Sequence, residues 1–150
     1  TMITYGSIYQ IAKDFEKSIS FYRALFQKEV HAQNKTRFAV FDINGLTFAI
    51  MNGRFDAAYP GEVSTEGARC ALYDDLVSIA EAANGGKVVI NLNTDDLQAE
   101  YERLKSLRIG SNMTKIRCVN AGNPYYYFCL KDPDDNTIEI TGNYHEELAR

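Results

Sequence analysis

Runs typical of strands and one run typical of a helix follow one another in the first third of the chain. Residues 3–12 are rich in β-branched and aromatic residues and lead to Asp14, which predicts a strand followed by a helix capped by that aspartate. Apolar residues then recur at intervals of three and four, the spacing of one helix face. These residues are Phe15, Ile19, Tyr22 and Phe26, with Phe21 and Leu25 widening the stripe. The pattern predicts an amphipathic helix.

Three more strand-like runs follow this helix, at residues 29–33, 37–43 and 46–51. Asn44 and Gly45 separate the last two runs. An Asn-Gly pair between alternating apolar runs is a strong signal of a β-hairpin, because both turn residues take positive φ. The first 52 residues are therefore predicted to form a β-α-β-β-β unit.

The same order of elements returns in the second half of the chain. A strand is predicted at residues 87–93, and Asp95 or Asp96 is the expected cap of the next helix. When Asp14 is placed on Asp96, the apolar positions of the two helices align, which supports an internal repeat. The aligned pairs are Phe15 with Leu97, Ile19 with Tyr101, Tyr22 with Leu104 and Leu25 with Leu107. Strands at 125–130 and 137–141, around a turn at 132–136, complete the second unit.

The segment between the two units is less regular. It contains several glycines and Pro60, and a short helix is predicted within residues 74–83. A chain of 150 residues has the usual length of one domain. We therefore expect a single α+β domain with a first unit at 1–52, a connector at 53–86, a second unit at 87–142 and a tail at 143–150.

Charge and composition narrow the function. The 20 acidic and 16 basic residues give a net charge of −4, the wrong sign for a surface that gathers nucleic-acid phosphates. No segment has the apolar length of a membrane span and the N-terminus lacks a signal-peptide pattern, so we expect a cytoplasmic protein that binds neither nucleic acid nor membrane. Cys70, Cys118 and Cys129 form no paired pattern and are expected to be reduced and mostly buried.

Two motifs carry a resemblance to a known family. The first is Lys-Asp-Phe-Glu-Lys-Ser-Ile-Ser-Phe-Tyr at residues 13–22, and the second is Asp-Pro-Asp-Asp-Asn at 132–136, followed by Ile138 and Glu139. Together with the internal repeat, these two motifs give the chain a sequence that resembles the vicinal oxygen chelate superfamily. That superfamily includes glyoxalase I, the extradiol dioxygenases and the bleomycin and fosfomycin resistance proteins. The resemblance implies two βαβββ repeats whose curved mixed sheets enclose a cleft. Asp135 stands where the family usually has glycine, at a position that favours the left-handed conformation and that aspartate tolerates.

The resemblance also implies where a divalent metal would bind. Enzymes of the superfamily take one ligand from the first strand and one from the last strand of each unit, and His, Gln and Glu are the usual types. In this chain those positions fall on Ser7, Ala49, Val89 and Glu139. Since a single carboxylate cannot hold a divalent ion against water, we expect no metal cofactor.

Another register of the first strand would change this ligand set. It would bring Tyr9 or Gln10 inward instead of Ser7, and Gln10 with Glu139 would then be the available ligands. His31 and His145 are expected to be exposed surface side chains. The alternative to a protein without a cofactor is one that binds a divalent metal through this second ligand set.

Strand alternation selects a set of residues for a concave face. If Glu139 faces the concave side, Ile138 and Ile140 face the helix, and the equivalent strand of the first unit follows the same parity. An apolar floor with a few hydroxyl, amide and carboxylate groups suits a small organic ligand. The ligand-binding candidates are Ser7, Tyr9, Thr47, Met51, Asn91, Asn93, Tyr125, Tyr127 and Glu139.

The leading hypothesis is a metal-independent binding protein of the glyoxalase/bleomycin-resistance type, which sequesters or senses a small organic ligand such as a drug. The net charge favours cationic ligands over phosphorylated ones. One alternative is a metal-dependent lyase, isomerase or dioxygenase of the same superfamily, with catalytic residues unassigned. The other is a structural or regulatory homodimer without turnover. A homodimer is expected in any case, because open sheets of this kind are completed by a second copy.

Overall fold

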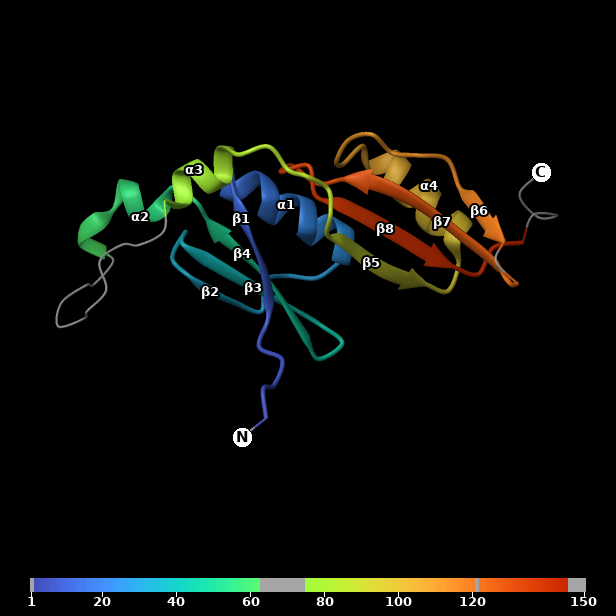
Figure 1. The fold of residues 1–150 in the computed structure, drawn as a ribbon, viewed down its shortest axis with the longest axis horizontal. Coiled ribbons are helices and arrows are strands. Elements are labelled where there is room, and N and C mark those ends of the chain that lie inside the picture. The colour runs from blue at the N-terminus through green and yellow to red at the C-terminus, as the bar shows by residue number, and fades with distance from the viewer. Residues whose placement is uncertain (1, 63–74, 121, 146–150) are drawn as a thin grey trace. The chain divides into compact units, whose positions relative to one another are not determined.

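The computed structural model describes residues 2–62, 75–120 and 122–145, and it divides the chain into two compact units, Thr1–Ala83 and Asn84–Arg150. Each unit contains one four-stranded mixed sheet covered on one face by a helix (Figure 1). Both units have the order strand, helix and three further strands. The α+β class and the two βαβββ repeats predicted from the sequence are therefore confirmed.

The first sheet has the strand order β1-β4-β3-β2. Its elements are β1 (Ile8–Ala12), α1 (Phe15–Phe26), β2 (Ala32–Asn34), β3 (Phe38–Ile43) and β4 (Leu46–Asn52). β1 runs parallel to β4, whereas the other neighbours are antiparallel. Three short helical elements follow in the same unit: α2 (Phe55–Ala58), the 3-10 turn η1 (Pro60–Glu62) and α3 (Leu76–Glu81).

Helix α1 begins and packs as its sequence predicts. The Asp14 carboxylate accepts a hydrogen bond from the backbone N–H of Lys17, which caps the helix. The ring of Tyr22 is fully buried and lies 4.8 Å from that of Phe48 on β4. Phe26 lies 5.5 Å from Phe41 on β3. These aromatic contacts form the core between α1 and one face of the first sheet.

The second sheet repeats this arrangement with the order β5-β8-β7-β6. Its elements are β5 (Val89–Thr94), α4 (Leu97–Leu107), β6 (Arg117–Asn120), β7 (Pro124–Lys131) and β8 (Thr137–Gly142). β5 is parallel to β8, as β1 is to β4. Asp96, and not Asp95, caps α4 through the N–H of Ala99. Leu107 is 47% exposed, so it does not match the buried Leu25 of α1.

Several predicted boundaries differ from those observed. The strand predicted at 3–12 begins only at Ile8. The limits predicted for the second strand, 29–33, are wrong, because the strand lies at Ala32–Asn34, where the chain pairs with β3. The strand predicted at 87–93 is Val89–Thr94, and the short helix within 74–83 is Leu76–Glu81. The sequence missed α2, η1 and β6, which are too short to show a periodic pattern.

Both predicted turns have the expected backbone. Asn44 and Gly45 have φ of 52° and 86°, and the Asp42 carboxylate accepts the Gly45 N–H at 2.8 Å. Asp135 has φ of 61°, the left-handed conformation expected at the position where the family has glycine. Among the described residues, no helix has the length and apolar character needed to cross a bilayer.

Candidate functional site

The pairing of first and last strands is equivalent in the two units. Tyr9 of β1 lies opposite Ala49 of β4, and Asn91 of β5 lies opposite Glu139 of β8. Residues directly opposite one another share a face of the sheet. The position that carries a carboxylate in the second unit is therefore occupied by alanine in the first.

The face of the second sheet that is turned away from α4 is called here the second open face. Phe128, Leu130, Ile138 and Ile140 are buried on the α4 side, as strand alternation predicts. The alternate positions form the second open face: Val89, Asn91, Asn93, Arg117, Val119, Tyr125, Tyr127, Cys129, Lys131, Thr137, Glu139 and Thr141. All five candidates that the sequence places in the second unit lie on this face.

Three of those candidates form one hydrogen-bonded cluster. The Tyr125 hydroxyl donates to Oε1 of Glu139 at 2.7 Å. Nδ2 of Asn91 donates to the same oxygen at 2.7 Å and lies 3.2 Å from the Tyr125 hydroxyl. Because both donors converge on one carboxylate oxygen, they hold Glu139 in a defined orientation.

Aromatic and cationic side chains surround this cluster. The rings of Tyr125 and Tyr127 are 5.7 Å apart and tilted by 38°. The Lys131 ammonium donates to the Thr137 hydroxyl at 2.7 Å. Arg117 lies opposite Tyr127 on the neighbouring strand. The face therefore offers flat apolar surface, hydrogen-bonding groups and charges of both signs.

Cys129 lies directly opposite Glu139. The pKa of its thiol depends on burial and on the charges of Glu139, Arg117 and Lys131. Burial raises the pKa of its thiol, and the negative charge of Glu139 raises it further, whereas Arg117 and Lys131 lower it. The thiol is therefore not activated as a nucleophile. Cys118 is exposed, so the expectation of mostly buried cysteines is wrong for that residue, and Cys70 lies outside the described residues.

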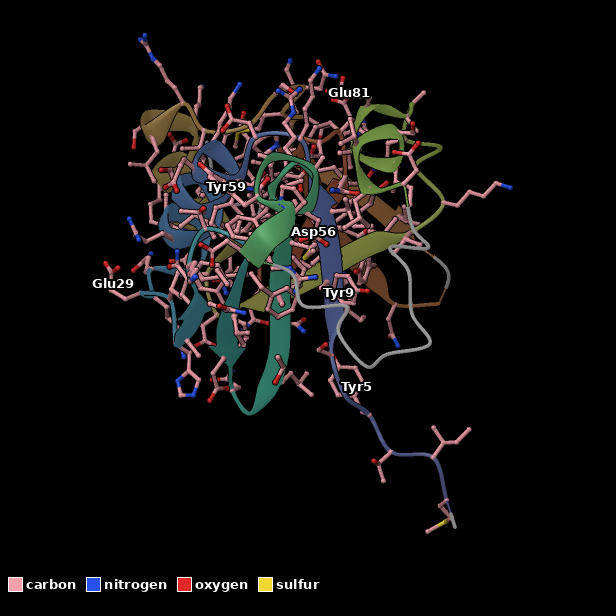
Figure 2. The ribbon with its side chains drawn as sticks, turned by 90° about the vertical axis from the view of Figure 1, so that its left-hand side faces the viewer. Tyr5, Tyr9, Glu29, Asp56, Tyr59 and Glu81 are labelled. Atoms are coloured by element: carbon pink, nitrogen blue, oxygen red, sulfur yellow. The ribbon has the colours of Figure 1, made fainter. Side chains whose placement is uncertain are left out.

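The face of the first sheet that is turned away from α1, the first open face, is more apolar. The rings of Tyr9 and Phe38 meet edge to face, 5.7 Å apart, and Met51 lies opposite Phe38. The Thr47 carbonyl accepts the hydroxyl of Tyr5, which lies near Tyr9 along the N-terminal segment (Figure 2). Tyr9 is exposed, whereas Ala49 and Met51 on the same face are buried, so this face is open at Tyr9 and already covered at Met51.

The alternative that turns Gln10 to the open face is wrong, whereas Tyr9, the other residue of that alternative, does face the open side. The Gln10 side chain accepts the hydroxyl of the buried Tyr22, a residue of α1, at 3.1 Å, so it points to the helix side and away from the open face. Ser7 is exposed and precedes β1. Tyr9 is therefore the first residue of β1 to face the open side.

An ion pair lies at the start of β3 in the first unit. Arg37 binds the carboxylate of Asp56 through two nitrogens, at 2.8 and 3.1 Å, and Asp56 is 7% exposed. These hydrogen bonds and the charge of Asp56 raise the pKa of Arg37, and Tyr9 adds to the effect. The pair joins α2, where Asp56 lies (Figure 2), to the start of β3. Its bidentate geometry serves to fix α2 in place.

The residues at the family's metal positions do not fit a divalent ion. Of Ser7, Ala49, Val89 and Glu139, only Glu139 is an effective ligand, and its Oε1 already accepts two hydrogen bonds. No group of three or more histidine, cysteine, aspartate or glutamate side chains within the described ranges is arranged to hold a metal. His31 and His145 are exposed, as expected.

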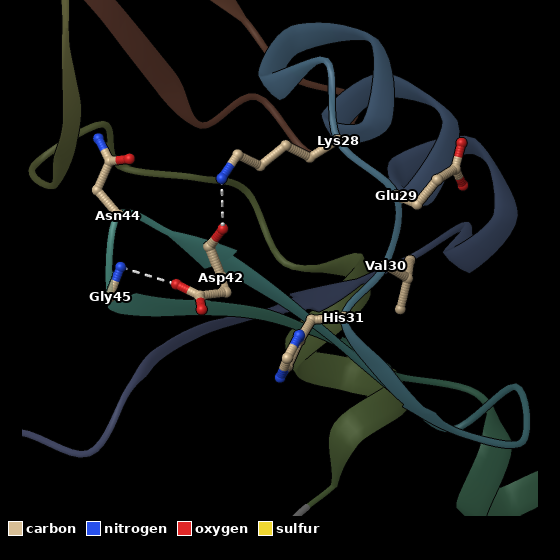
Figure 3. A pocket seen from close by; sticks show the side chains of 7 residues that line it. All are labelled: Lys28, Glu29, Val30, His31, Asp42, Asn44 and Gly45. Carbon is tan, nitrogen blue, oxygen red and sulfur yellow. Dashed lines mark hydrogen bonds between the residues drawn. The ribbon is translucent and has the colours of Figure 1, made fainter.

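A pocket of 540 Å³ lies elsewhere, between the segment after α1 and the β3–β4 hairpin. Its lining residues are Lys28, Glu29, Val30, His31, Asp42, Asn44 and Gly45 (Figure 3). The polar groups are used locally: Lys28 donates to the Asp42 carbonyl, the Asp42 carboxylate holds the turn, and Glu29 pairs with Arg23. Their side chains do not converge on a common point (Figure 3), so the pocket lacks an organised set of binding groups.

Arg117 and Lys131 are the two charged residues of the second open face that sequence reasoning missed. Lys131 could have been found from the alternation that placed Tyr125 and Tyr127 on this face. Arg117 could not, because β6 gave no recognisable strand pattern and its register with β7 depends on tertiary pairing.

Comparison with known proteins agrees with the fold and the motifs. The family model for the Glyoxalase/Bleomycin resistance protein/Dioxygenase superfamily matches residues 4–140. A search of curated proteins found no match.

Solved structures of similar fold are distant in sequence. A lactoylglutathione lyase from Agrobacterium tumefaciens has 17% identity and a TM-score of 0.59, over 95% of this chain and 94% of the other. A glyoxalase-related enzyme from Fulvimarina pelagi has 18% identity and a TM-score of 0.60, over 95% and 89%. The fosfomycin resistance protein FosX from Listeria monocytogenes, complexed with Mn(II) and sulfate, has 19% identity and a TM-score of 0.61, over 98% and 95%. The family match over most of the chain shows that this protein belongs to the glyoxalase/bleomycin resistance protein/dioxygenase superfamily.

Proposed function

We propose that this protein binds a small organic molecule on the second open face, in the cytoplasm and without a metal ion. The observation that carries the proposal is the convergence of Asn91 and Tyr125 on one oxygen of Glu139. An oriented carboxylate beside two aromatic rings is a typical arrangement for recognising an organic ligand. Tyr127 would contact the apolar part of the ligand, and Asn93 extends the polar rim.

The position of the cluster supports a role in binding. Tyr125 is 41% exposed and Asn91 is also exposed, so a ligand can reach the cluster from solvent. Within the part of the chain that the structure describes, Oε2 of Glu139 has no hydrogen-bond partner. That oxygen is therefore available to accept a hydrogen bond from a ligand.

The family and its solved members suggest which compounds to test. Bleomycin resistance appears in the name of the family, and one similar structure is a fosfomycin resistance protein. Ser7, Tyr9, Thr47 and Met51 stay candidates for ligand contacts in the first unit. We also propose that the protein is a homodimer, which sedimentation of the purified chain would test.

Calorimetric titration with bleomycin, fosfomycin and a set of small organic fragments tests the binding proposal. We expect at least one compound to bind, and Glu139→Gln and Tyr125→Phe each to weaken its binding by about fivefold to tenfold, the upper range for one ordinary hydrogen bond. Glu102→Gln is the matched control, because Glu102 is exposed on α4, on the opposite side of the sheet. The proposal is wrong if no compound binds, or if both site variants bind as tightly as the control.

A metal-dependent lyase, isomerase or dioxygenase is the second candidate, and the Mn(II) complex of the FosX structure favours testing it. Because the residues at the ligand positions do not fit a divalent ion, we expect freshly purified protein to contain no stoichiometric metal. We also expect Ni²⁺, Zn²⁺, Mn²⁺ and Fe²⁺ to leave its melting temperature unchanged, since an ion bound to the native state would raise it. Elemental analysis and thermal-shift measurements check this. Stoichiometric metal that Glu139→Gln removes would replace the metal-free proposal with the enzyme.

A further inference from the structure

The second open face carries charges of both signs on adjacent strands. Glu139 lies on β8, while Lys131 on β7 lies opposite Thr137, and Arg117 on β6 lies opposite Tyr127. The net charge of the whole chain is −4, but this face carries two cations and one carboxylate. The local charge therefore differs in sign from the overall charge, and it is the local charge that a bound ligand meets.

The side chains of Glu139, Lys131 and Arg117 differ in how many of their donor and acceptor atoms already have a hydrogen-bond partner in the protein. Lys131 donates to Thr137 beside it, and Oε1 of Glu139 accepts from Asn91 and Tyr125. With respect to residues 2–62, 75–120 and 122–145, the Arg117 guanidinium makes no hydrogen bond or ion pair, and Oε2 of Glu139 accepts none. One oxygen of Glu139 and the whole guanidinium of Arg117 are thus available to a ligand, whereas one of the three donors of Lys131 already has a partner.

A ligand that carries only positive or only negative charge does not match this face best. A cation would pair with Glu139 but would meet the repulsion of Arg117 and Lys131, and an anion would meet that of Glu139. A molecule that carries both an ammonium and an acid group satisfies both ends. We propose that the second open face binds zwitterionic organic molecules, with the ammonium on Oε2 of Glu139 and the acid group on the guanidinium of Arg117.

The register sets the size of such a ligand. Arg117 and Glu139 are two strands apart and offset by two residues, which places their Cα atoms about 12 Å apart, for strands about 4.8 Å apart and a rise of about 3.4 Å per residue. Tyr127 and Cys129 of β7 lie between them. Since both side chains stand on the same face and each spans part of this distance, the ligand has roughly the length of a dipeptide and lies across β7, over Tyr127.

This inference rests on the proposed binding function and names its ligand class. Three forms of one dipeptide test it by calorimetry: phenylalanyl-glycine, its N-acetyl derivative, which lacks the ammonium, and its C-terminal amide, which lacks the carboxylate. We expect the zwitterion to bind about threefold to fivefold more tightly than either capped form, the range of an exposed ion pair. The preference should fall as salt is added.

Two variants assign the two ends of the ligand. Glu139→Gln should remove the preference over the N-acetyl form while keeping the preference over the amide, and Arg117→Gln should do the reverse. Glu102→Gln on α4 should change neither preference. Equal binding of the three forms, binding of none of them below about 10 mM, or identical effects of the two variants would overturn the inference.

The outcomes separate this inference from the function on which it rests. Fragments that bind the wild type, and bind Glu139→Gln and Tyr125→Phe more weakly, would support the binding function, and equal binding of the three dipeptide forms in the same protein would reject the zwitterion alone. Fragments that do not bind at all would reject the binding function itself.

Discussion

Replacing Gly142 by alanine is expected to destabilise the protein by about 3 kcal/mol, the upper range for a forced overlap in a packed structure. Gly142 ends β8 and pairs with Thr94 of β5. A Cβ atom at this position would overlap the Thr94 carbonyl oxygen and come within 3.0 Å of the Thr94 carbonyl carbon. Since these are backbone atoms, no side-chain rotation relieves the overlap, and the two strands must separate.

Urea unfolding followed by circular dichroism measures this effect. Gly85→Ala is the matched control, because nothing lies within 4 Å of a Cβ atom there. It should leave the stability unchanged or raise it slightly, through the lower entropy of the unfolded chain. Stability of Gly142→Ala within about 0.5 kcal/mol of the wild type would contradict the prediction. Because β5 and β8 also carry Asn91 and Glu139, Gly142→Ala should weaken ligand binding as well.

Replacing Asp132 by alanine is the second substitution with a large expected effect, and it should lower the free energy of unfolding by about 3 kcal/mol. Asp132 is 2% exposed, and its carboxylate accepts the backbone N–H groups of Asp134 and Asn136, both at 2.8 Å, and the Asn136 amide at 2.9 Å. A hydrogen bond to a charged group contributes about 1.5–3 kcal/mol, and alanine removes three of them. Because Asp134 and Asn136 are only half-buried, water replaces part of this loss, and the net cost stays near the upper value for one such bond. The loss falls on the turn between β7 and β8, so it also affects the strand that carries Glu139.

Asp132→Asn should lie between alanine and the wild type, because an amide keeps one acceptor oxygen. Asp95→Ala is the control: Asp95 is exposed and, unlike Asp96, does not cap α4. Its stability should stay within about 0.5 kcal/mol of the wild type. If Asp132→Ala unfolds at the same urea concentration as Asp95→Ala, the Asp132 turn does not support the sheet as described.

The β3–β4 turn and the β7–β8 turn show why short sequence motifs predicted the positions of strands and helices in this fold. Asn44-Gly45 and the Asp132 turn are local structures, whose dihedral angles and hydrogen bonds involve residues at most four positions apart. The caps at Asp14 and Asp96 are equally local. Short β2 and β6 have no such signal, and their limits are set by the strands with which they pair.

The sequence by itself determined the repeated order of strands and helices, and the face on which Tyr125, Tyr127 and Glu139 lie, because caps, turns and strand alternation act over a few residues. Tertiary structure alone decided that Asn91 and Tyr125 meet at one oxygen of Glu139, that Gln10 turns to Tyr22, and that Arg117 joins the same face. Each of these depends on the register between strands distant in the chain. Register is set by the packing of the whole sheet, and a shift of one residue would turn every side chain to the other face.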